Sequence, residues 1–361
     1  MTKPYIGGQA VIEGVMMRSP KSFVVAVRRP DGKIAIREQK WELLLAKLPF
    51  LRWPLLRGAL VLLESLHNGF SALKFSAEHG MPPEEQGKKA GALVTKLMML
   101  GLFLWADGPD AAPVPTAEDI AAQKKRDTES TLMLVLATVM MVSLFIALPH
   151  VLTWALGLWL GPALDSQGML FHVVDGVFRV GILVGYIYAI SRSKEAARLF
   201  QYHGAEHKAI WTYETDKALT VGEAKPFTTR HPRCGTSFLF IVVGVAVTLH
   251  VVLLPFVPRL HPNEFVHQLL LVFVKIPMAF PIAGIAYELQ RWSAKESCPR
   301  AITMLTRPGI WMQSITTQEP EDGQLEIALL SLEKAMDREH GRTTRAEGIN
   351  LYPDFAAAKA A

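Results

Sequence analysis

The sequence predicts a mainly α-helical polytopic membrane protein with about four transmembrane helices, a small β hairpin or sheet region at the N-terminus, and cytoplasmic helices. Half of its 361 residues are hydrophobic, a high share for a soluble protein. These residues gather in blocks close to the roughly 20 residues that a helix needs to cross a bilayer. Near the N-terminus, two runs rich in β-branched residues flank a turn sequence instead.

Residues 1–40 are expected to form the β region. The two β-rich runs lie on either side of Pro-Asp-Gly at 30–32, which favours a tight turn. Paired glycines at positions 7 and 8 suggest unusual backbone angles or the close approach of another group. Glu13 follows them among apolar residues. Two roles are open for it: a strand-edge carboxylate that faces water, or a group at a metal or substrate site.

Residues 41–106 are expected to form amphipathic and interfacial helices, the first over 41–50 and a longer one over Leu55–Glu78. The apolar run Leu93–Trp105 is shorter than the roughly 18 residues expected of a span, so we do not count it as one. Residues 107–130 are rich in Pro, Ala and charge, which predicts a flexible linker.

Residues 131–290 are predicted to form a four-span membrane domain with a cytoplasmic loop at 191–235. Each span is an apolar run with few charges. The runs are Thr131–Leu148, extended beyond Pro149 by Val151–Leu160, then Phe171–Ile190, Phe238–Leu254 and His267–Tyr287.

Residues 291–361 are expected to form a cytoplasmic helical tail. An interfacial helix is expected around residues 308–312, and a last helix from Pro320 to about Arg338. No regular structure is expected beyond Gly341. The last helix carries an apolar stripe that predicts packing on the cytoplasmic domain: Leu325, Leu329, Leu332 and Met336.

The distribution of positive charge predicts the orientation in the membrane. The loop 149–170 contains no Lys or Arg, and the loop 255–266 contains only Arg259, whereas 191–235 contains eight. The positive-inside rule therefore puts both termini and the middle loop on the cytoplasmic side of a bacterial inner membrane.

The charge balance also bears on partners. The net charge of +5 suits contact with the anionic lipids of the cytoplasmic leaflet. No nucleic-acid partner is expected, because there is no basic stripe with interleaved aromatic residues. The two cysteines provide no disulfide framework. Protein partners and oligomeric state stay open.

The segment Tyr202–Lys208 is the most informative stretch of the chain. It follows a run of helix-forming residues without Pro or Gly, so it is expected to be helical. His203 and His207 then lie on one helix face, where both imidazoles can reach one metal ion, and Glu206 can face the same ion. This is the H-x-x-E-H order of the inverzincin metallopeptidases, in which the Glu is the general base. Gly204 weakens the helix and permits another backbone or a ligand to come close.

A second cluster, His231-Pro-Arg-Cys234, has metal-ligand spacing within a tight turn. Arg233 in this turn is a further site candidate. Four ligands from the two clusters would close the site and make it structural, whereas three would leave a position open for catalysis. The third ligand is open: His231, Cys234, or Glu288 at the cytoplasmic end of the fourth span. The cofactor is expected to be zinc or another divalent transition metal.

Charges also occur inside the predicted spans. Lys275 lies near the middle of the fourth span, and Asp175 and Arg179 are four residues apart in the second. Intramembrane charges are candidates for function by default, although a buried ion pair explains them equally. Five histidines lie near the outer span ends and are candidates for metal binding or pH sensing, or are scattered interfacial residues: His150, His172, His250, His261 and His267.

The chain resembles the bacterial domain-of-unknown-function 1385 family, described as predicted metal-dependent multi-pass membrane proteins. The resemblance lies in Gly7–Met17, Glu195–Lys208, His231–Phe238, Tyr287–Leu289 and Pro308–Pro320. It implies a membrane location and supports the metal site, but it supplies no substrate.

Three classes of function follow. The first is a metal-dependent membrane hydrolase for a peptide or lipid-type substrate, with Glu206 as catalytic base. The second is a non-catalytic scaffold or assembly factor with a structural metal site. The third is a transporter or channel, which the lack of an obvious inverted repeat disfavours. Convergence of three ligands beside a cleft favours the enzyme, convergence of four favours the scaffold, and divergence excludes both.

Overall fold

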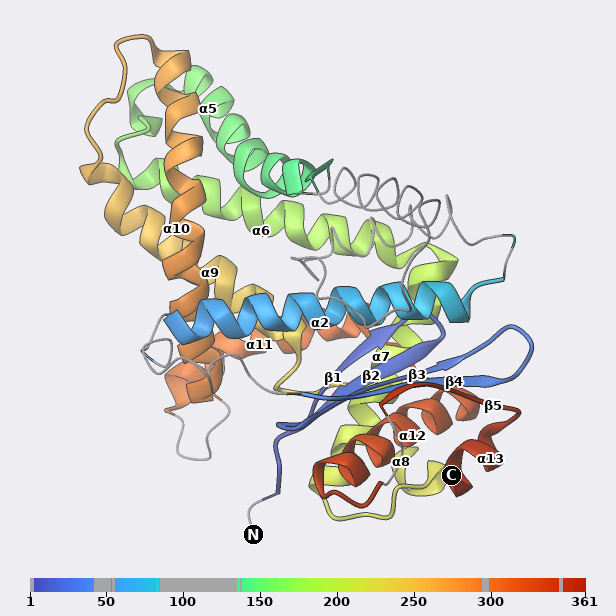
Figure 1. Cartoon of the computed structure of the whole chain (residues 1–361). Coiled ribbons are helices and arrows are strands. Elements are labelled where there is room, and N and C mark those ends of the chain that lie inside the picture. The colour runs from blue at the N-terminus through green and yellow to red at the C-terminus, as the bar shows by residue number, and fades with distance from the viewer. Residues whose placement is uncertain are drawn as a thin grey trace, which may run out of the picture.

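A computed structural model of the chain describes residues 3–41, 53, 56–82, 84, 135–136, 138–293, 299–343 and 347–361. It combines a helix-covered β-sheet with a group of long apolar helices (Figure 1). The helix expected over 41–50 lies almost wholly outside the described residues. The run Leu93–Trp105, the linker 107–130 and Cys298 lie wholly outside them.

The sheet has five strands in the order β1-β2-β3-β4-β5, and every neighbouring pair is antiparallel. The strands are β1 (Gly7–Val11), β2 (Gly14–Arg18), β3 (Ser22–Arg28), β4 (Ile34–Lys40) and β5 (Gly348–Tyr352). The expected N-terminal β region is confirmed. The end of the chain differs from the expectation, because β5 and the short helix α13 (Phe355–Ala360) form beyond Gly341.

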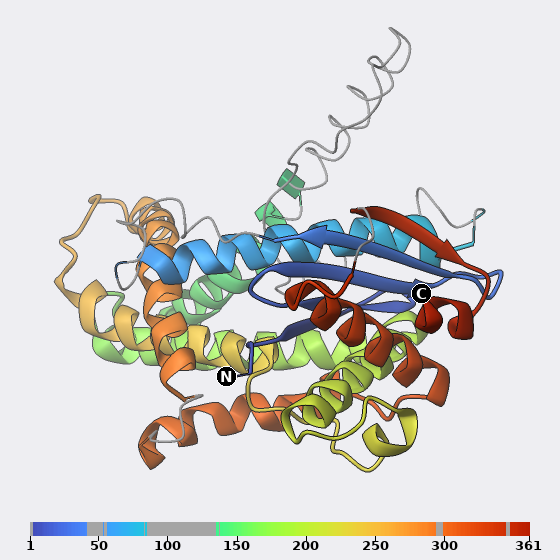
Figure 2. The ribbon, with the colours of Figure 1, turned by 60° about the horizontal axis from the view of Figure 1, so that its bottom comes forward.

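Both faces of the sheet are covered by helices. Helix α2 (Leu56–Gly80) lies on one face, and α7 (Lys194–Glu214) and α12 (Asp322–Glu339) lie on the other (Figures 1 and 2). Successive strand residues point to opposite faces. A Cβ added at Gly8 would meet Glu206 of α7, whereas the next residue, Gln9, reaches Gly69 of α2. The sheet is therefore the middle layer between helices from the middle and the end of the chain.

Helix α12 bears out the expectation for the tail. It begins two residues after Pro320, behind a capping box of Glu321 and Gln324. Its apolar stripe packs against strands β2 and β3. All four stripe residues are buried: Leu325, Leu329, Leu332 and Met336.

In the part of the chain that the structure describes, four helices are long and apolar enough to cross a membrane, as the sequence predicted. The first, Thr138–Leu160, includes the π-helical turn η2 (Ser143–Ala147) and helix α5 (Leu148–Leu160). The others are α6 (Met169–Ser191), α9 (Gly235–Leu253) with its extension η4 (Leu254–Phe256), and α10 (Glu264–Ser293). Pro149 does not end the first helix. Its missing N–H falls just after the π turn, where the helix is already widened.

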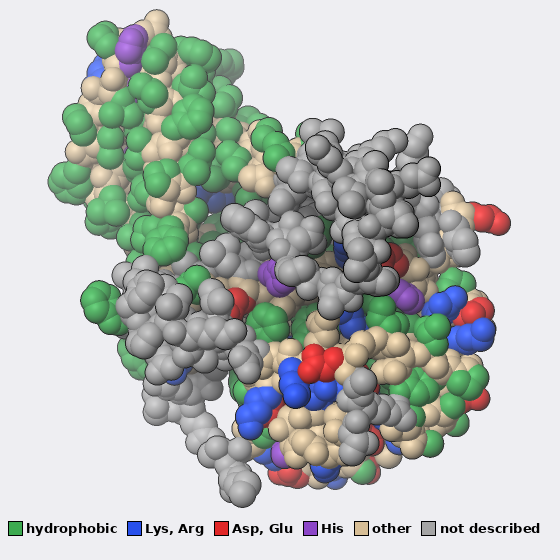
Figure 3. Space-filling view, in the orientation of Figure 1, with side chains coloured by type: hydrophobic (Ala, Val, Ile, Leu, Met, Phe, Trp, Pro, Cys, Tyr) green, Lys and Arg blue, Asp and Glu red, His purple; other side chains and the backbone are tan. Residues whose placement is uncertain are grey.

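The remaining described helices connect the two parts. Helix α11 (Arg300–Thr316) packs along α9, in the region where an interfacial helix was expected. The short α8 (Val221–Ala224) and η3 (Gly161–Leu164) lie in loops. Hydrophobic side chains cover the part built by the long apolar helices, whereas charged side chains gather over the sheet part (Figure 3). The molecule is thus a candidate membrane bundle beside a polar, sheet-centred domain.

Candidate metal centre

Helix α7 carries the three residues of the H-x-x-E-H motif, His203, Glu206 and His207. The hydroxyl of Ser193 caps its N-terminus by accepting from the amide of Ala196 at 3.2 Å. Gly204 lies in its middle, where a Cβ would come within 2.0 Å of the carbonyl oxygen of Gln318. The close approach of another backbone, expected from this glycine, is therefore present. It brings the segment after α11 directly over α7.

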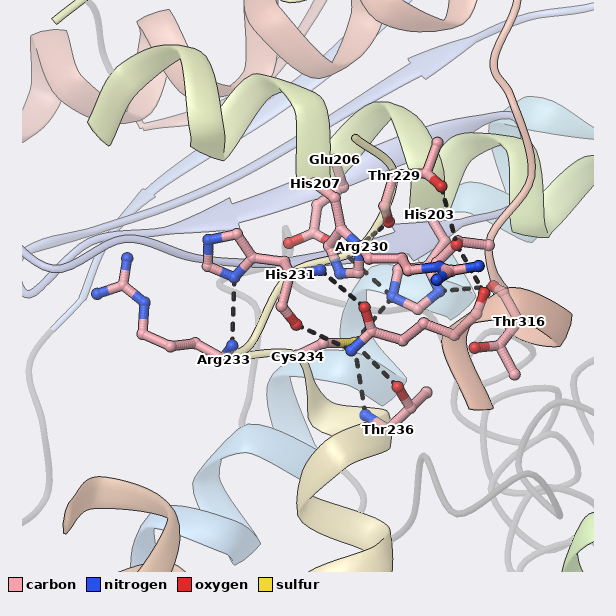
Figure 4. Close-up of polar contacts among 12 residues, drawn as sticks. His203, Glu206, His207, Thr229, Arg230, His231, Arg233, Cys234, Thr236 and Thr316 are labelled. Atoms are coloured by element: carbon pink, nitrogen blue, oxygen red, sulfur yellow. Dashed lines mark hydrogen bonds and ion pairs between the residues drawn. The ribbon is translucent and has the colours of Figure 1, made fainter. Parts of the chain in front are cut away.

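His203, His207 and Cys234 converge on one point (Figure 4). Their candidate ligand atoms all lie within 4.8 Å of one another, and His203 Nε2 lies 3.1 Å from Cys234 Sγ. Zinc bound tetrahedrally at 2.0–2.3 Å sets its ligand atoms about 3.4–3.6 Å apart. The cluster needs only small side-chain adjustments to reach that spacing.

The hydrogen bonds of both histidines select the tautomer that binds a metal. His203 Nδ1 donates to the carbonyl of Thr316 at 2.8 Å, and His207 Nδ1 donates to the carbonyl of Thr229. Each Nε2 then keeps its lone pair, as in histidines that ligate metals. His207 Nε2 is buried and makes no hydrogen bond within the described part of the chain. Leaving such an atom unpaired costs about 1–3 kcal/mol, so a metal ion fits this position.

Glu206 lies beside the ligand atoms rather than among them. Its Oε2 is 3.6 Å from His207 Nε2 and 3.9 Å from His203 Nε2. Burial raises the pKa of this carboxyl, and the nearby imidazoles of His203 and His231 partly offset the effect. Strand β1 makes room for it, because a Cβ at Gly8 would lie 2.4 Å from Glu206 Oε1. The close approach expected at the paired glycines thus occurs at Gly8.

Cys234 begins helix α9 as its N-cap. Its Sγ accepts from the amide of Thr236 at 3.5 Å and lies 3.3 Å from the Thr236 hydroxyl. The positive end of a helix dipole favours a negatively charged ligand such as a thiolate. Gln313 of α11 holds the preceding turn by accepting from the His231 amide at 2.7 Å and donating to the His231 carbonyl at 2.8 Å.

The structure does not bring His231 into the ligand group, although its ring lies near His207. Its Nδ1 accepts from the amide of Arg233 at 3.3 Å, and its Nε2 lies 3.4 Å from a carboxylate oxygen of Glu214. Both ring nitrogens are therefore engaged. Burial lowers the pKa of His231. Arg233 pairs with Glu214 as well and lies over the ring of Tyr5.

Three other sequence candidates lie apart from the cluster. Glu288 forms a two-pronged ion pair with Arg57 of α2. Glu13, in the β1–β2 turn with a φ of 52°, pairs with Arg198 and so anchors α7 to the sheet. Lys275 lies within the apolar helices in a cluster of its own.

Several supporting residues were missed from the sequence. Thr229 and Thr316 act through backbone carbonyls, which leave no trace in side-chain patterns. Gln313 is fully buried on α11. The sequence contained one signal for Gln313, since it is a polar side chain in a helix otherwise expected to lie at an apolar interface. Gly309 on the same helix permits contact with α9, because a Cβ there would lie 2.3 Å from Ser237 Cα.

The fold and the site together define a membrane-helix protein with a possible His/His/Cys metal-binding cluster. A family model described as "Protein of unknown function (DUF1385)" matches residues 53–338, and the chain belongs to this family. The chain is also 30% identical over 341 residues to a Bacillus subtilis (strain 168) protein named "Uncharacterized protein YqhQ", covering 92% of each. No solved structure matches it.

Proposed function

We propose that this protein is a zinc-dependent hydrolase of the bacterial cytoplasmic membrane, acting at the cytoplasmic face. One observation carries the proposal. Three protein ligands, His203, His207 and Cys234, converge with a buried carboxylate beside them. Two imidazoles and a thiolate are a donor set that suits zinc. Three ligands leave a fourth position for substrate or water, the arrangement of catalytic rather than structural zinc sites.

Each side chain has a distinct role in this proposal. His203, His207 and Cys234 hold the ion, which would supply Lewis acidity and activated water. Glu206 accepts a proton during hydrolysis and returns it to the leaving group. Burial raises its pKa, which brings the carboxyl closer to the operating pH, as general acid–base catalysis requires. In this proposal His231 and Glu288 are not ligands, because each already has another partner.

The substrate class follows from location. The loop that carries the site is basic and lies between two candidate spans, so the positive-inside rule favours the cytoplasmic side. A site at that boundary can reach a peptide segment or a lipid ester in the leaflet. Anionic lipids are the partner that the charge of this region favours.

A structural metal site is the second candidate, and the depth of the cluster favours it. The His207 side chain is 1% exposed, and even His203 is only 15% exposed. An ion here would tie α7 to the start of α9 and hold the middle loop in place. The protein would then act as a scaffold or assembly factor.

Metal content separates these possibilities. Wild type, Glu206→Gln, Cys234→Ala and the control Cys298→Ala are purified without chelator and assayed for metal. We expect one zinc per chain in wild type, Glu206→Gln and Cys298→Ala, and loss of zinc from Cys234→Ala. A screen against ester and peptide substrates then compares wild type with Glu206→Gln. Turnover that Glu206→Gln abolishes supports the hydrolase, and a bound metal without turnover supports the scaffold. Wild type without metal would overturn both.

A further inference from the structure

A continuous chain of polar contacts joins all four candidate spans. Lys275 of α10 donates to His150 Nδ1 and to Asp175 Oδ1, each at 3.0 Å. Asp175 Oδ2 accepts from Arg179 at 3.0 Å, and Arg179 lies 3.4 Å from His250 Nδ1. Helices α5, α6, α9 and α10 each contribute at least one of these residues.

The cluster lies inside the protein rather than at its lipid-facing surface. His150, Asp175, His250 and Lys275 are each at most 2% exposed, and Arg179 is 6% exposed. Lys275 lies near the middle of α10, and His250 lies toward the end of α9 nearest the loop 257–263. The cluster therefore occupies the half of the bundle away from the metal centre, which lies at the opposite end of α9.

Several polar atoms of the cluster have no hydrogen-bond partner among the described residues. They include Arg179 Nε and His250 Nε2. His172 is fully buried and lies close enough to interact electrostatically with His150 and His250. Gln268 Oε1 is the acceptor that faces His150, whose Nε2 carries the hydrogen because its Nδ1 accepts from Lys275. A native protein leaves few buried polar atoms unpaired, so these atoms indicate that an ordered water or an ion binds here.

The unpaired atoms are mainly donors. His250 Nδ1 faces the guanidinium of Arg179 and must accept, so His250 Nε2 carries the hydrogen. Arg179 Nε is always a donor. Among the described residues, the N–H groups at Arg179 Nε and His250 Nε2 thus remain without an acceptor. A ligand that satisfies them is itself an acceptor.

The charges of the cluster do not balance. Arg179 and Lys275 are cationic, and Asp175 is the one carboxylate among the described residues that pairs with them. The other charged residues of the span helices, Glu264, Glu288 and Arg291, lie toward their ends. With neutral histidines, the cluster carries a net charge of +1. An uncompensated charge inside a membrane is costly, so a bound anion would stabilise it.

We propose that this cluster is a binding site for a small monovalent inorganic anion of the halide class. The anion accepts from the free Nε–H of Arg179 and neutralises the excess charge of Arg179 and Lys275. Asp175 stands between the two cations and limits how strongly the anion binds. The site is separate from the metal centre and does not depend on its function.

Chloride is the probe. The thermal unfolding midpoint of the detergent-purified protein is measured in sodium chloride and in sodium gluconate at equal ionic strength. We expect wild type to unfold at least about 3 °C higher in chloride, since a ligand that binds only the folded state raises its stability. Glu206→Gln, which alters the metal centre, and Arg259→Gln, in an exposed outer loop, should keep the full difference.

Two variants that change the net charge of the cluster in opposite directions test the charge argument. Lys275→Met brings the net charge to zero, so the chloride difference should vanish. Asp175→Asn brings it to +2, so chloride affinity, measured by titration of the midpoint, should rise at least about tenfold, as one to two kcal/mol of added attraction gives. A gain cannot result from misfolding. Equal midpoints of wild type in chloride and gluconate, or no gain in Asp175→Asn, would overturn the proposal.

Discussion

At the scale of single residues, the candidate metal centre depends on the hydrogen-bond partners of the histidine rings. The carbonyls of Thr316 and Thr229 fix the two imidazoles so that both Nε2 atoms face Cys234. His231 has the same chemistry, but its Nδ1 accepts a backbone hydrogen and its Nε2 lies against Glu214. Residue type therefore does not decide which histidine ligates. The backbone partner of each ring decides it.

Gly8→Ala tests the fit of strand β1 against Glu206. The new Cβ would lie 2.4 Å from Glu206 Oε1, so the carboxylate must move away from the metal ligands. We expect bound zinc to remain and hydrolytic turnover to fall at least tenfold, with a stability loss of about 1–3 kcal/mol for the forced repacking. Metal content, turnover and thermal unfolding measure these effects.

Gly7→Ala is the matched control, because its Cβ would meet only Tyr5 at an ordinary 4.0 Å. It should behave like wild type in all three measurements. Wild-type turnover in Gly8→Ala would show that the position of Glu206 does not matter for the reaction.

The sequence predicted which residues share a helix face better than it predicted which residues are candidate ligands. The i, i+4 spacing of His203 and His207 on a helix is enough to predict that they share one face. The spacing of His231 and Cys234 favoured both equally, and only the path of the turn separates them. The partner of Glu288, Arg57, is 231 residues away in the chain, and no local pattern reports such a pair.

At the scale of elements, helix α11 supports the site through one buried side chain. Gln313 bonds both backbone groups of His231 and, at 3.1 Å, the hydroxyl of Ser237. It thereby holds the turn that presents Cys234 at the start of α9. The site is thus built by α7 and α9 and held by α11.

Gln313→Ala should loosen this turn. Its loss leaves the buried amide and carbonyl of His231 without partners, which costs about 1–3 kcal/mol for each unsatisfied group. Because the turn carries Cys234, we expect zinc affinity to fall by about 10–100-fold, as for other groups that support metal ligands. Competition with a chromophoric chelator measures the affinity.

Ser314→Ala, an exposed neighbour on the same helix, is the control and should leave zinc affinity unchanged. Equal affinities of the two variants would mean that the turn holds its shape without Gln313.

Periodicity was sufficient to predict the elements whose burial repeats along one segment. The apolar stripe of α12 and the four long apolar runs are of this kind. Strand β5 was missed for a physical reason. It forms by pairing with β4, more than 300 residues earlier in the chain, and its outward side chains Ile349 and Leu351 are exposed. The apolar residues of this edge strand are its exposed ones, so their alternation does not mark a buried face.

At the scale of the whole molecule, three distant parts of the chain build one domain. The N-terminal strands, helix α7 from the middle loop, and α12 with β5 from the tail share a single core. The candidate metal ligands lie where this domain meets the candidate spans, since Cys234 caps the span helix α9. Sequence patterns report each part separately, so this assembly was not predictable from them.

The orientation of this assembly in the membrane yields the last prediction. The loop containing Lys217 is basic and should face the cytoplasm, whereas the loops containing Gln167 and Asn263 should face outward. Each of these three residues is exposed and is replaced singly by Cys in a Cys298→Ser background, in which Cys234 is buried. A membrane-impermeant maleimide should label Gln167→Cys and Asn263→Cys in intact cells, but Lys217→Cys only after the inner membrane is permeabilised. The reverse pattern would put the metal centre outside, where an enzyme would meet extracytoplasmic substrates and the anionic cytoplasmic leaflet could not be its partner. Labelling thus decides which pool of substrates is worth screening.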